Sequence, residues 1–178
     1  MDQRSVKSSE RRERILNLLK HSREPIKGSD LAEMLDVSRQ VIVGDVSLLK
    51  AKNLPIVATS QGYLFMSDQT DSFAIERTIA CKHLPEESEI ELNILVDHGV
   101  FVKDVTVEHP VYGDLMASLR IANRRDVKKF MEEIRATSAA FLLELTGGIH
   151  LHTIAADNEG AIQEALEALE EKGILLQS

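Results

Sequence analysis

Cysteine is nearly absent from this chain of 178 residues: Cys81 is the only one, so no intrachain disulfide can form. No run of apolar residues approaches the roughly 20 that are needed to span a bilayer. Residues 1–9 are polar and lack the apolar core of a signal peptide. The chain contains 43% hydrophobic and 28% charged residues, which is an ordinary balance for a globular protein. We therefore expect a cytoplasmic protein without a membrane partner.

Positive charge is in deficit overall, because the formal net charge is −8, but it is unevenly distributed. Residues 1–68 contain 11 Lys and Arg against 9 Asp and Glu, whereas residues 69–178 contain 10 against 20. A cationic surface favours contact with phosphates, and an anionic one opposes it. The charge distribution favours nucleic-acid binding by the first part of the chain but does not decide it.

Three helices followed by a β-hairpin are predicted in the first 65 residues. Apolar residues at helical spacing predict helices at 9–21, 29–35 and 39–52. The expected N-caps of these helices are Ser9, Ser29 and Ser38. Short apolar runs at 56–58 and 63–65 flank Gly62, which can adopt the positive φ of a hairpin turn. This order predicts a winged helix-turn-helix domain over residues 1–67.

The helix at 39–52 is the expected DNA-reading element. If Ile42, Val46 and Leu49 face the core, then Arg39, Gln40 and Val43 point outward. Arg can pair with guanine, Gln with adenine, and Val can contact a thymine methyl group. Phosphate contacts are expected from Ser38, Ser47, Lys50, Arg11, Arg12 and Arg14. The alternative is a protein–protein module with a solvated charged face, but the order of elements favours double-stranded operator DNA.

A resemblance to the helix-turn-helix of many bacterial effector-responsive repressors extends over residues 31–50, LAEMLDVSRQVIVGDVSLLK. Those proteins often carry Arg at the position of Gly44. This departure costs about 1 kcal/mol of helix propensity relative to Ala. It also removes one phosphate contact that the resemblance would imply.

We expect an α+β domain over residues 68–178, with a mixed or antiparallel sheet and a sandwich-like arrangement of layers. Strands are expected at 73–83, 100–108, 114–121, 141–145 and 149–155. Helices are expected at 85–98, at 126–135, and between the N-cap Asn158 and Gly173. The strands at 141–145 and 149–155 are expected to form a hairpin across Gly147 and Gly148.

Four side chains in this second part are spaced like metal ligands. His150 and His152 are two apart on an expected strand, so both leave the same face. His83 ends another strand, and Glu91 lies two turns into the following helix. Three imidazoles and one carboxylate suit Zn, Ni, Co or Fe(II) better than Ca or Mg. A half-exposed pair of strand histidines is the alternative, and spacing alone favours it.

The segment His109-Pro110-Val111-Tyr112-Gly113 predicts a rigid turn that places the His109 imidazole beside the Tyr112 phenol. The two side chains could line a ligand pocket, or they could form a packed corner. The residues alone leave both interpretations open.

Several segments of the second part resemble the 3H domain, which follows a winged helix in its family. They are KHLPEE at 82–87 with Glu91-Leu92, VDHG at 96–99, VEHPVYG at 107–113 and GGIHLHT at 147–153. Nearly the whole chain thus resembles niacin-responsive transcriptional repressors. The resemblance implies repression of NAD-biosynthesis or niacin-uptake genes, with nicotinic acid as corepressor. It also implies one divalent transition metal, nickel or zinc, held by His83, Glu91, His150 and His152.

Two functions remain in competition. In the first, an open metal coordination position takes the carboxylate or the pyridine nitrogen of nicotinate, and His109 and Tyr112 orient it. In the second, the chain is a metal-dependent enzyme acting on a small aromatic acid, fused to a DNA-binding domain, in which Glu91 activates a metal-bound water. The metal already requires that carboxylate, and no Gly-rich nucleotide loop is present. We therefore expect a repressor without enzymatic activity, and a homodimer joined mainly through the second domain, because operators have paired half-sites.

Overall fold

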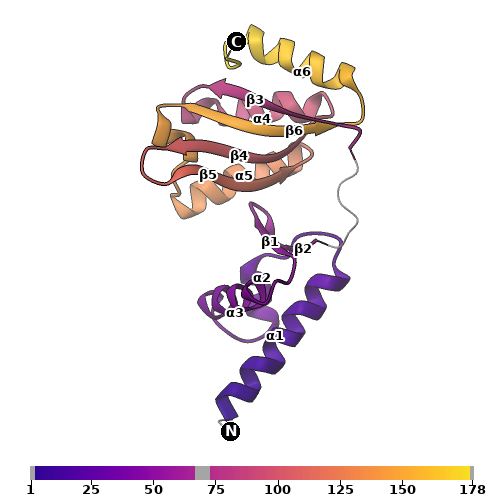
Figure 1. Cartoon of the computed structure of the whole chain (residues 1–178), viewed down its shortest axis with the longest axis vertical. Coiled ribbons are helices and arrows are strands. Elements are labelled where there is room, and N and C mark those ends of the chain that lie inside the picture. The colour runs from indigo at the N-terminus through magenta and orange to yellow at the C-terminus, as the bar shows by residue number, and fades with distance from the viewer. Residues whose placement is uncertain (1–2, 67–72, 177–178) are drawn as a thin grey trace. The chain divides into compact units, whose positions relative to one another are not determined.

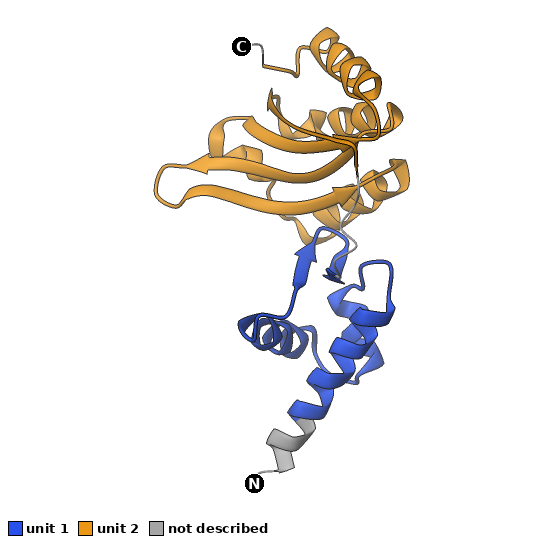
Figure 2. Cartoon of the chain, turned by 45° about the vertical axis from the view of Figure 1, so that its right-hand side comes forward, with its two compact units in different colours: residues 1–71 blue, residues 72–178 orange. Residues whose placement is uncertain are grey.

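The computed structural model describes residues 3–66 and 73–176, without the side chains of residues 3–7 (Figure 1). The chain divides into two compact units, residues 1–71 and 72–178 (Figure 2). The expected boundary between residues 67 and 68 lies outside the described residues. Within the described ranges, no helix has the length and apolar character to cross a membrane.

The first unit is a three-helix domain with a β-hairpin. Its elements are α1 (Gln3–His21), α2 (Gly28–Met34), α3 (Arg39–Ala51), β1 (Ile56–Thr59) and β2 (Gly62–Phe65). The strands pair antiparallel around Gly62, whose φ is 131°. One apolar side of each helix and of β1 forms the buried core: Ile15, Leu19, Leu31, Ala32, Ile42, Val46, Leu49 and Ile56. The expected winged-helix order is confirmed, and its core is contained within this unit.

Two of the three expected helix starts are wrong. Ser9 lies inside α1, because residues 3–8 contain no Gly or Pro that would stop a helix from continuing toward Gln3. Lys27 occupies the N-cap position of α2, and the Ser29 hydroxyl donates instead to Asp30. Ser38 does cap α3, since its hydroxyl oxygen accepts a hydrogen bond from the Val41 amide at 3.3 Å. The third helix start was therefore predicted correctly.

The second unit is a four-stranded antiparallel sheet with helices on one face. Its elements are β3 (Ile75–Lys82), the 3₁₀ turn η1 (Pro85–Glu87), α4 (Ser88–Asp97), β4 (Phe101–His109), β5 (Gly113–Ile121), α5 (Arg124–Thr137), the 3₁₀ turn η2 (Leu142–Thr146), β6 (Ile149–Ala156) and α6 (Glu159–Glu171). The strand order is β3-β6-β4-β5, and every neighbouring pair is antiparallel. The expected α+β class is confirmed, and the sheet is antiparallel rather than mixed.

The two faces of this sheet differ in what covers them. Apolar side chains of α4, α5 and α6 join inward-facing strand residues such as Cys81, Leu119 and Ile154 in a single core. Strand alternation turns Met116, Ile149 and Leu151 to the opposite face, where they are 69%, 47% and 39% exposed. The four expected metal ligands lie on the helix-covered face.

The expected strand at 141–145 is wrong, because these residues form η2 instead. Phe141, Leu142 and Leu143 are consecutive apolar residues and do not alternate as a half-exposed strand would. The Glu144 amide donates to the Phe141 carbonyl at 3.1 Å, and the Glu144 carboxylate accepts from the Phe141 amide at 2.7 Å. These local hydrogen bonds occupy polar groups of the segment, so it needs no partner strand for them. The strand β6 pairs with β3 and β4 instead.

Candidate functional site

The helix α3 presents most of the expected DNA-contacting side chains to solvent. Arg39 and Gln40 are exposed near its N-terminus, and Val43 is half-buried beside them. Ser38, Ser47 and Lys50 are also exposed. The buried stripe of Ile42, Val46 and Leu49 holds the opposite side of the helix on the core. This arrangement leaves the N-terminal part of α3 available to a DNA groove.

Two of the arginines expected at phosphates, Arg11 and Arg12, also pair with a buried carboxylate. The Arg11 guanidinium donates to the Asp45 carboxylate at 2.5 Å, and Arg12 donates to its other oxygen at 3.2 Å. Asp45 is buried on α3, so these ion pairs fix α3 against α1. Arg11 and Arg12 are therefore paired with Asp45, whereas Arg14 is exposed, and phosphate contacts from all three stay a prediction. The spacing of Asp45 three residues after Ile42 was the sequence signal for its inward orientation.

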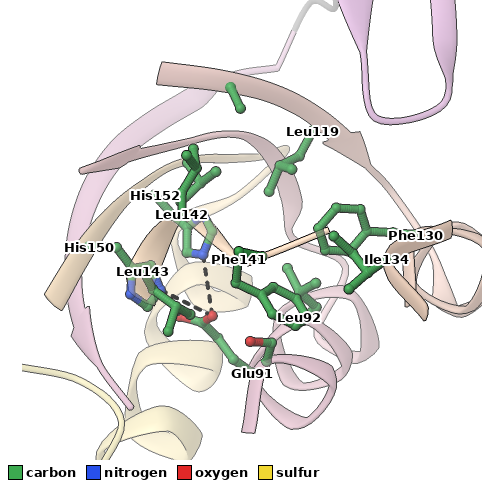
Figure 3. Close-up of a pocket in the computed structure, with 14 residues that line it drawn as sticks. Glu91, Leu92, Leu119, Phe130, Ile134, Phe141, Leu142, Leu143, His150 and His152 are labelled. Atoms are coloured by element: carbon green, nitrogen blue, oxygen red, sulfur yellow. Dashed lines mark hydrogen bonds and ion pairs between the residues drawn. The ribbon is translucent and has the colours of Figure 1, made fainter. Parts of the chain in front are cut away.

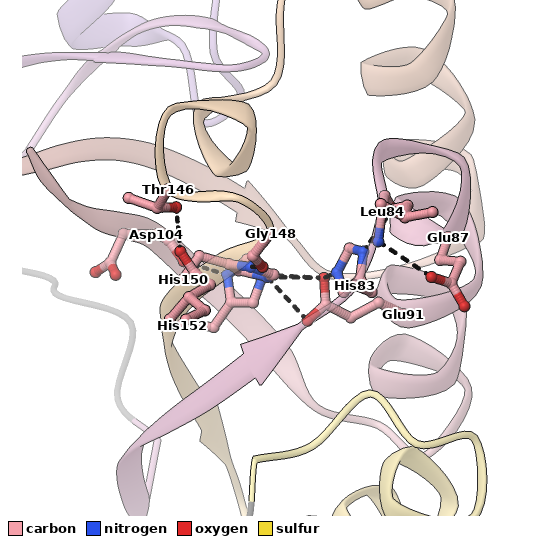
Figure 4. A network of polar contacts seen from close by, with 10 residues as sticks. His83, Leu84, Glu87, Glu91, Asp104, Thr146, Gly148, His150 and His152 are labelled. Atoms are coloured by element: carbon pink, nitrogen blue, oxygen red, sulfur yellow. Dashed lines mark hydrogen bonds and ion pairs between the residues drawn. The ribbon is translucent and has the colours of Figure 1, made fainter.

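The four expected metal ligands converge on the helix-covered face of the second unit's sheet (Figure 4). His83 follows β3, Glu91 lies on α4, and His150 and His152 are two apart on β6. All four are between 2% and 6% exposed. The antiparallel register places Cys81 opposite His150, which brings the end of β3 to the histidines of β6. The interpretation of His150 and His152 as a half-exposed pair is therefore wrong.

Glu91 lies among the three imidazoles. Its carboxylate oxygens are 2.8 Å from His83 Nε2, 3.2 Å from His150 Nε2 and 3.3 Å from His152 Nε2. Atoms that bind one transition metal at about 2.0–2.2 Å lie roughly 3.0–3.5 Å from each other. Each imidazole nitrogen therefore lies at about this distance from Glu91, and the nitrogen-rich donor set suits a transition metal.

Backbone carbonyls orient each imidazole by its other nitrogen. The Nδ1 atoms of His83, His150 and His152 lie 2.8, 2.9 and 2.7 Å from the carbonyl oxygens of Leu84, Gly148 and Asp104, respectively. A carbonyl only accepts, so each Nδ1 carries a proton and each Nε2 faces Glu91. Metal-binding histidines are usually held in this way, because the outer bond fixes both the tautomer and the ring.

The protonation of the cluster follows from these contacts. Burial raises the pKa of the Glu91 carboxyl, but the three imidazoles outweigh burial and hold that pKa well below its usual range. Burial lowers the pKa of His83 and of His152, yet the Glu91 carboxylate outweighs it and raises both. A cation would displace protons from these imidazoles, so metal affinity should fall as the pH falls.

Gly148 joins the two histidine-bearing segments, a role that the sequence did not reveal. Its carbonyl accepts from the His83 amide at 3.3 Å, in addition to the His150 contact. Its φ is +98°, and a Cβ at this position would lie 2.3 Å from the His83 carbonyl oxygen. Only glycine allows the backbone of residue 83 to approach so closely.

Cys81 is a further neighbour of the cluster that sequence reasoning missed. Ligand atoms of Cys81, Glu91 and His150 all lie within 4.8 Å of one another. Burial raises the pKa of the Cys81 thiol, and the nearby Glu91 carboxylate raises it further. The available signal was strand alternation, which puts Cys81 and His83 on the same face of the sheet.

An apolar cavity of about 190 Å³ adjoins this cluster. Its polar lining consists of Ser88, Glu91, His150 and His152. The apolar lining comes from α4, α5, η2, the connection between α5 and η2, and the strands: Leu92, Val105, Ala117, Leu119, Phe130, Ile134, Ala140, Phe141, Leu142 and Leu143. Figure 3 shows the histidines at one side and Phe130 with Ile134 at the other. An apolar cavity of about 150 Å³ in another protein accommodates benzene, so this one can hold a single aromatic ring.

The pair expected to orient a ligand at the cluster, His109 and Tyr112, lies elsewhere. Both belong to the β4–β5 hairpin, where Tyr112 is 74% exposed, and neither lines the cavity. His109 is four residues along β4 from Val105, which is roughly 13 Å. Its Nδ1 accepts hydrogen bonds from the Val111 and Tyr112 amides. The segment forms an exposed turn in which the two rings contact each other, and it contributes nothing to the cavity lining beside the cluster.

Comparison with known proteins agrees with the division into units. Residues 11–64 match the HTH domain family, and residues 76–178 match the 3H domain family. The transcription repressor NadR of Bacillus subtilis (strain 168) is 53% identical over 167 residues, which cover 93% of each chain. The probable transcription repressor NiaR of Thermotoga maritima is 39% identical over 168 residues, which cover 94% of each chain. Each family match falls within one structural unit.

Proposed function

The chain belongs to the family of transcription repressors that join an HTH domain to a 3H domain, and we propose that nicotinic acid is its corepressor. We further propose that a divalent transition metal in the 3H domain is part of the sensor. The genes it represses would serve NAD biosynthesis or niacin uptake. The ligands of the metal, nickel or zinc, would be His83, Glu91, His150 and His152.

The convergence of three oriented imidazoles and Glu91 beside a cavity of ring size carries this proposal. A bound divalent metal supplies positive charge, which attracts the carboxylate of an aromatic acid. The apolar walls of the cavity remove the ring from water. The site thus joins the two chemical features of nicotinic acid, its carboxylate and its flat ring.

Regulation accounts for the site better than catalysis does. Glu91 contacts all three histidines, so it is not free to act as a base toward a substrate. The relatives that match nearly the full chain are named as transcription repressors. We therefore favour a sensor over an enzyme.

Selection of binding sites from a random duplex library tests the proposal. The metal-loaded full chain, with nicotinic acid present, should enrich a two-fold symmetric sequence. Without nicotinic acid the enrichment should be much weaker. Equal enrichment under both conditions would exclude nicotinic acid as corepressor, while enrichment of no sequence would exclude the repressor function.

Substitution of Arg39 should relax base recognition. Arg39→Ala removes an exposed side chain near the N-terminus of α3, so it should cost about 1–3 kcal/mol of operator affinity. The loss should be accompanied by tolerance of another base at one position of each half-site. Lys50→Ala is the matched control, because loss of a phosphate contact weakens all sequences about equally. Unchanged affinity of the Arg39 variant in a gel-shift titration would refute this placement of the reading helix.

The exposed sheet face offers a surface for the proposed homodimer. Met116, Ile149 and Leu151 are exposed apolar side chains on the face opposite the helices. Met116→Lys combined with Leu151→Lys should convert a dimer to a monomer in light scattering, because buried unpaired ammonium groups are costly. Met34→Lys, on the first unit, should leave the dimer intact. A wild-type chain that is monomeric at micromolar concentration, with and without nicotinic acid and DNA, would exclude the dimer.

A further inference from the structure

Ser88 has a hydroxyl whose environment is unusual for this chain. Among the described residues, its Oγ is the only buried side-chain oxygen or nitrogen without a hydrogen-bond partner. The residue is 4% exposed and belongs to the lining of the cavity beside the histidine cluster. Buried hydroxyls are normally paired, so a solitary one at a cavity wall indicates a polar ligand atom.

The position of Ser88 relates it to the cluster. It lies one helical turn before Glu91 on α4, and side chains three residues apart share a helix face with Cβ atoms roughly 5–6 Å apart. That separation is comparable to the width of a six-membered ring. A ring in the cavity could therefore reach Ser88 with one edge and the cluster with another.

The chemistry of the cavity decides which end of the ligand meets Ser88. A carboxylate needs several donors or a cation when it is buried, and one hydroxyl does not provide this. The cluster end is the only part of the cavity lining with ionisable groups. A neutral pyridine nitrogen has a single lone pair and needs only one donor, which the Ser88 hydroxyl can be.

We propose that the Ser88 hydroxyl donates a hydrogen bond to the ring nitrogen of a pyridine monocarboxylate, whose ring fills the cavity and whose carboxylate faces the histidine cluster. Ser88 is then the residue that distinguishes a pyridine ring from a benzene ring. This inference rests on the proposed function, since it takes nicotinic acid as the ligand.

Calorimetric titration of the nickel-loaded full chain with nicotinic acid and with benzoic acid tests the inference. Benzoic acid has the same ring size and carboxylate but lacks the nitrogen. The wild type should bind nicotinic acid about 10-fold or more tightly than benzoic acid. Ser88→Ala should lose about 10-fold in nicotinic acid affinity and little in benzoic acid affinity, because Ser88 makes no bond to benzoic acid. The preference for nicotinic acid over benzoic acid should therefore disappear in the Ser88→Ala variant.

Ser118→Ala is the matched control, because Ser118 lies on β5 between the cavity residues Ala117 and Leu119 but does not line the cavity. It should keep the wild-type preference. Ser88→Cys, which retains the size of the side chain but is a weak donor, gives a second variant should Ser88→Ala not fold. If a Ser88 variant kept its nickel and still preferred nicotinic acid to benzoic acid, the proposed role of Ser88 would be overturned, but the proposed function would not. Failure of the wild type to bind either acid would overturn the proposed function together with the inference.

Discussion

Replacement of His150 and His152 by Ala should abolish the response to nicotinic acid while DNA binding persists. The two side chains supply half of the proposed metal ligands and are almost fully buried. The metal content should fall from about one ion per chain to near none. A ligand changes DNA affinity only if it binds the DNA-competent state better than the other state. Without the metal, the ratio of operator affinities with and without nicotinic acid should therefore fall to about one.

Weak, ligand-independent DNA binding should remain in this variant. The core of the first unit, from Ile15 to Ile56, contains no residue of the second unit and does not depend on the metal. Wild-type protein treated with a chelator should behave like the variant, which separates loss of metal from loss of packing. His109→Ala, on the exposed hairpin, is the matched histidine control and should retain both metal and response. If the double variant still responded fully to nicotinic acid, the cluster would have a structural role only and would not be part of the sensor.

Gly148→Ala should strongly weaken the second unit and its metal binding. The added Cβ would lie 2.3 Å from the His83 carbonyl oxygen, and a rotamer change cannot relieve a clash with backbone. The residue would also be held at a φ of +98°, which alanine rarely adopts. We expect a loss of about 2–5 kcal/mol in the free energy of unfolding of this unit. Zinc affinity should fall roughly 10- to 100-fold, because His83 and His150 both depend on this backbone.

Gly147→Ala provides the comparison for this prediction. Gly147 also has a positive φ, +62°, but within the described structure an added Cβ would meet no atom within 4 Å. The cost should be only about 1–2 kcal/mol, from the left-handed backbone itself. Thermal unfolding and competitive zinc titration of both variants measure the difference. Equal behaviour of the two variants would refute the close approach of Gly148 to His83.

Much of the fold was predictable because it follows from local patterns. The cap of α3 at Ser38 and the buried stripe of Ile42, Val46 and Leu49 depend on residues within a few positions of each other. The same holds for Asn158, whose side chain accepts from the Ala161 amide at the start of α6. The four metal-ligand candidates were also predictable, since strand alternation and helix spacing assign each to a face. Their convergence, however, required the resemblance to a family.

What could not be predicted depends on contacts between distant segments. The ion pairs of Arg11 and Arg12 with Asp45 join residues more than 30 positions apart. The cavity arises because η2 folds over the sheet, whereas its sequence had suggested a strand. The role of Gly148 depends on the His83 backbone, which lies 65 positions earlier. Such tertiary contacts override local propensity and leave no periodic signal.

Nicotinic acid, acting through the metal-loaded 3H domain, should strengthen operator binding. The most direct test is the affinity of the nickel- or zinc-loaded full chain for its selected operator, with and without saturating nicotinic acid, at one fixed salt concentration. We expect nicotinic acid to increase this affinity about 5- to 150-fold, which is the usual range of coupling between two sites. An operator affinity that is unchanged by nicotinic acid, in protein shown to carry its metal, would contradict it.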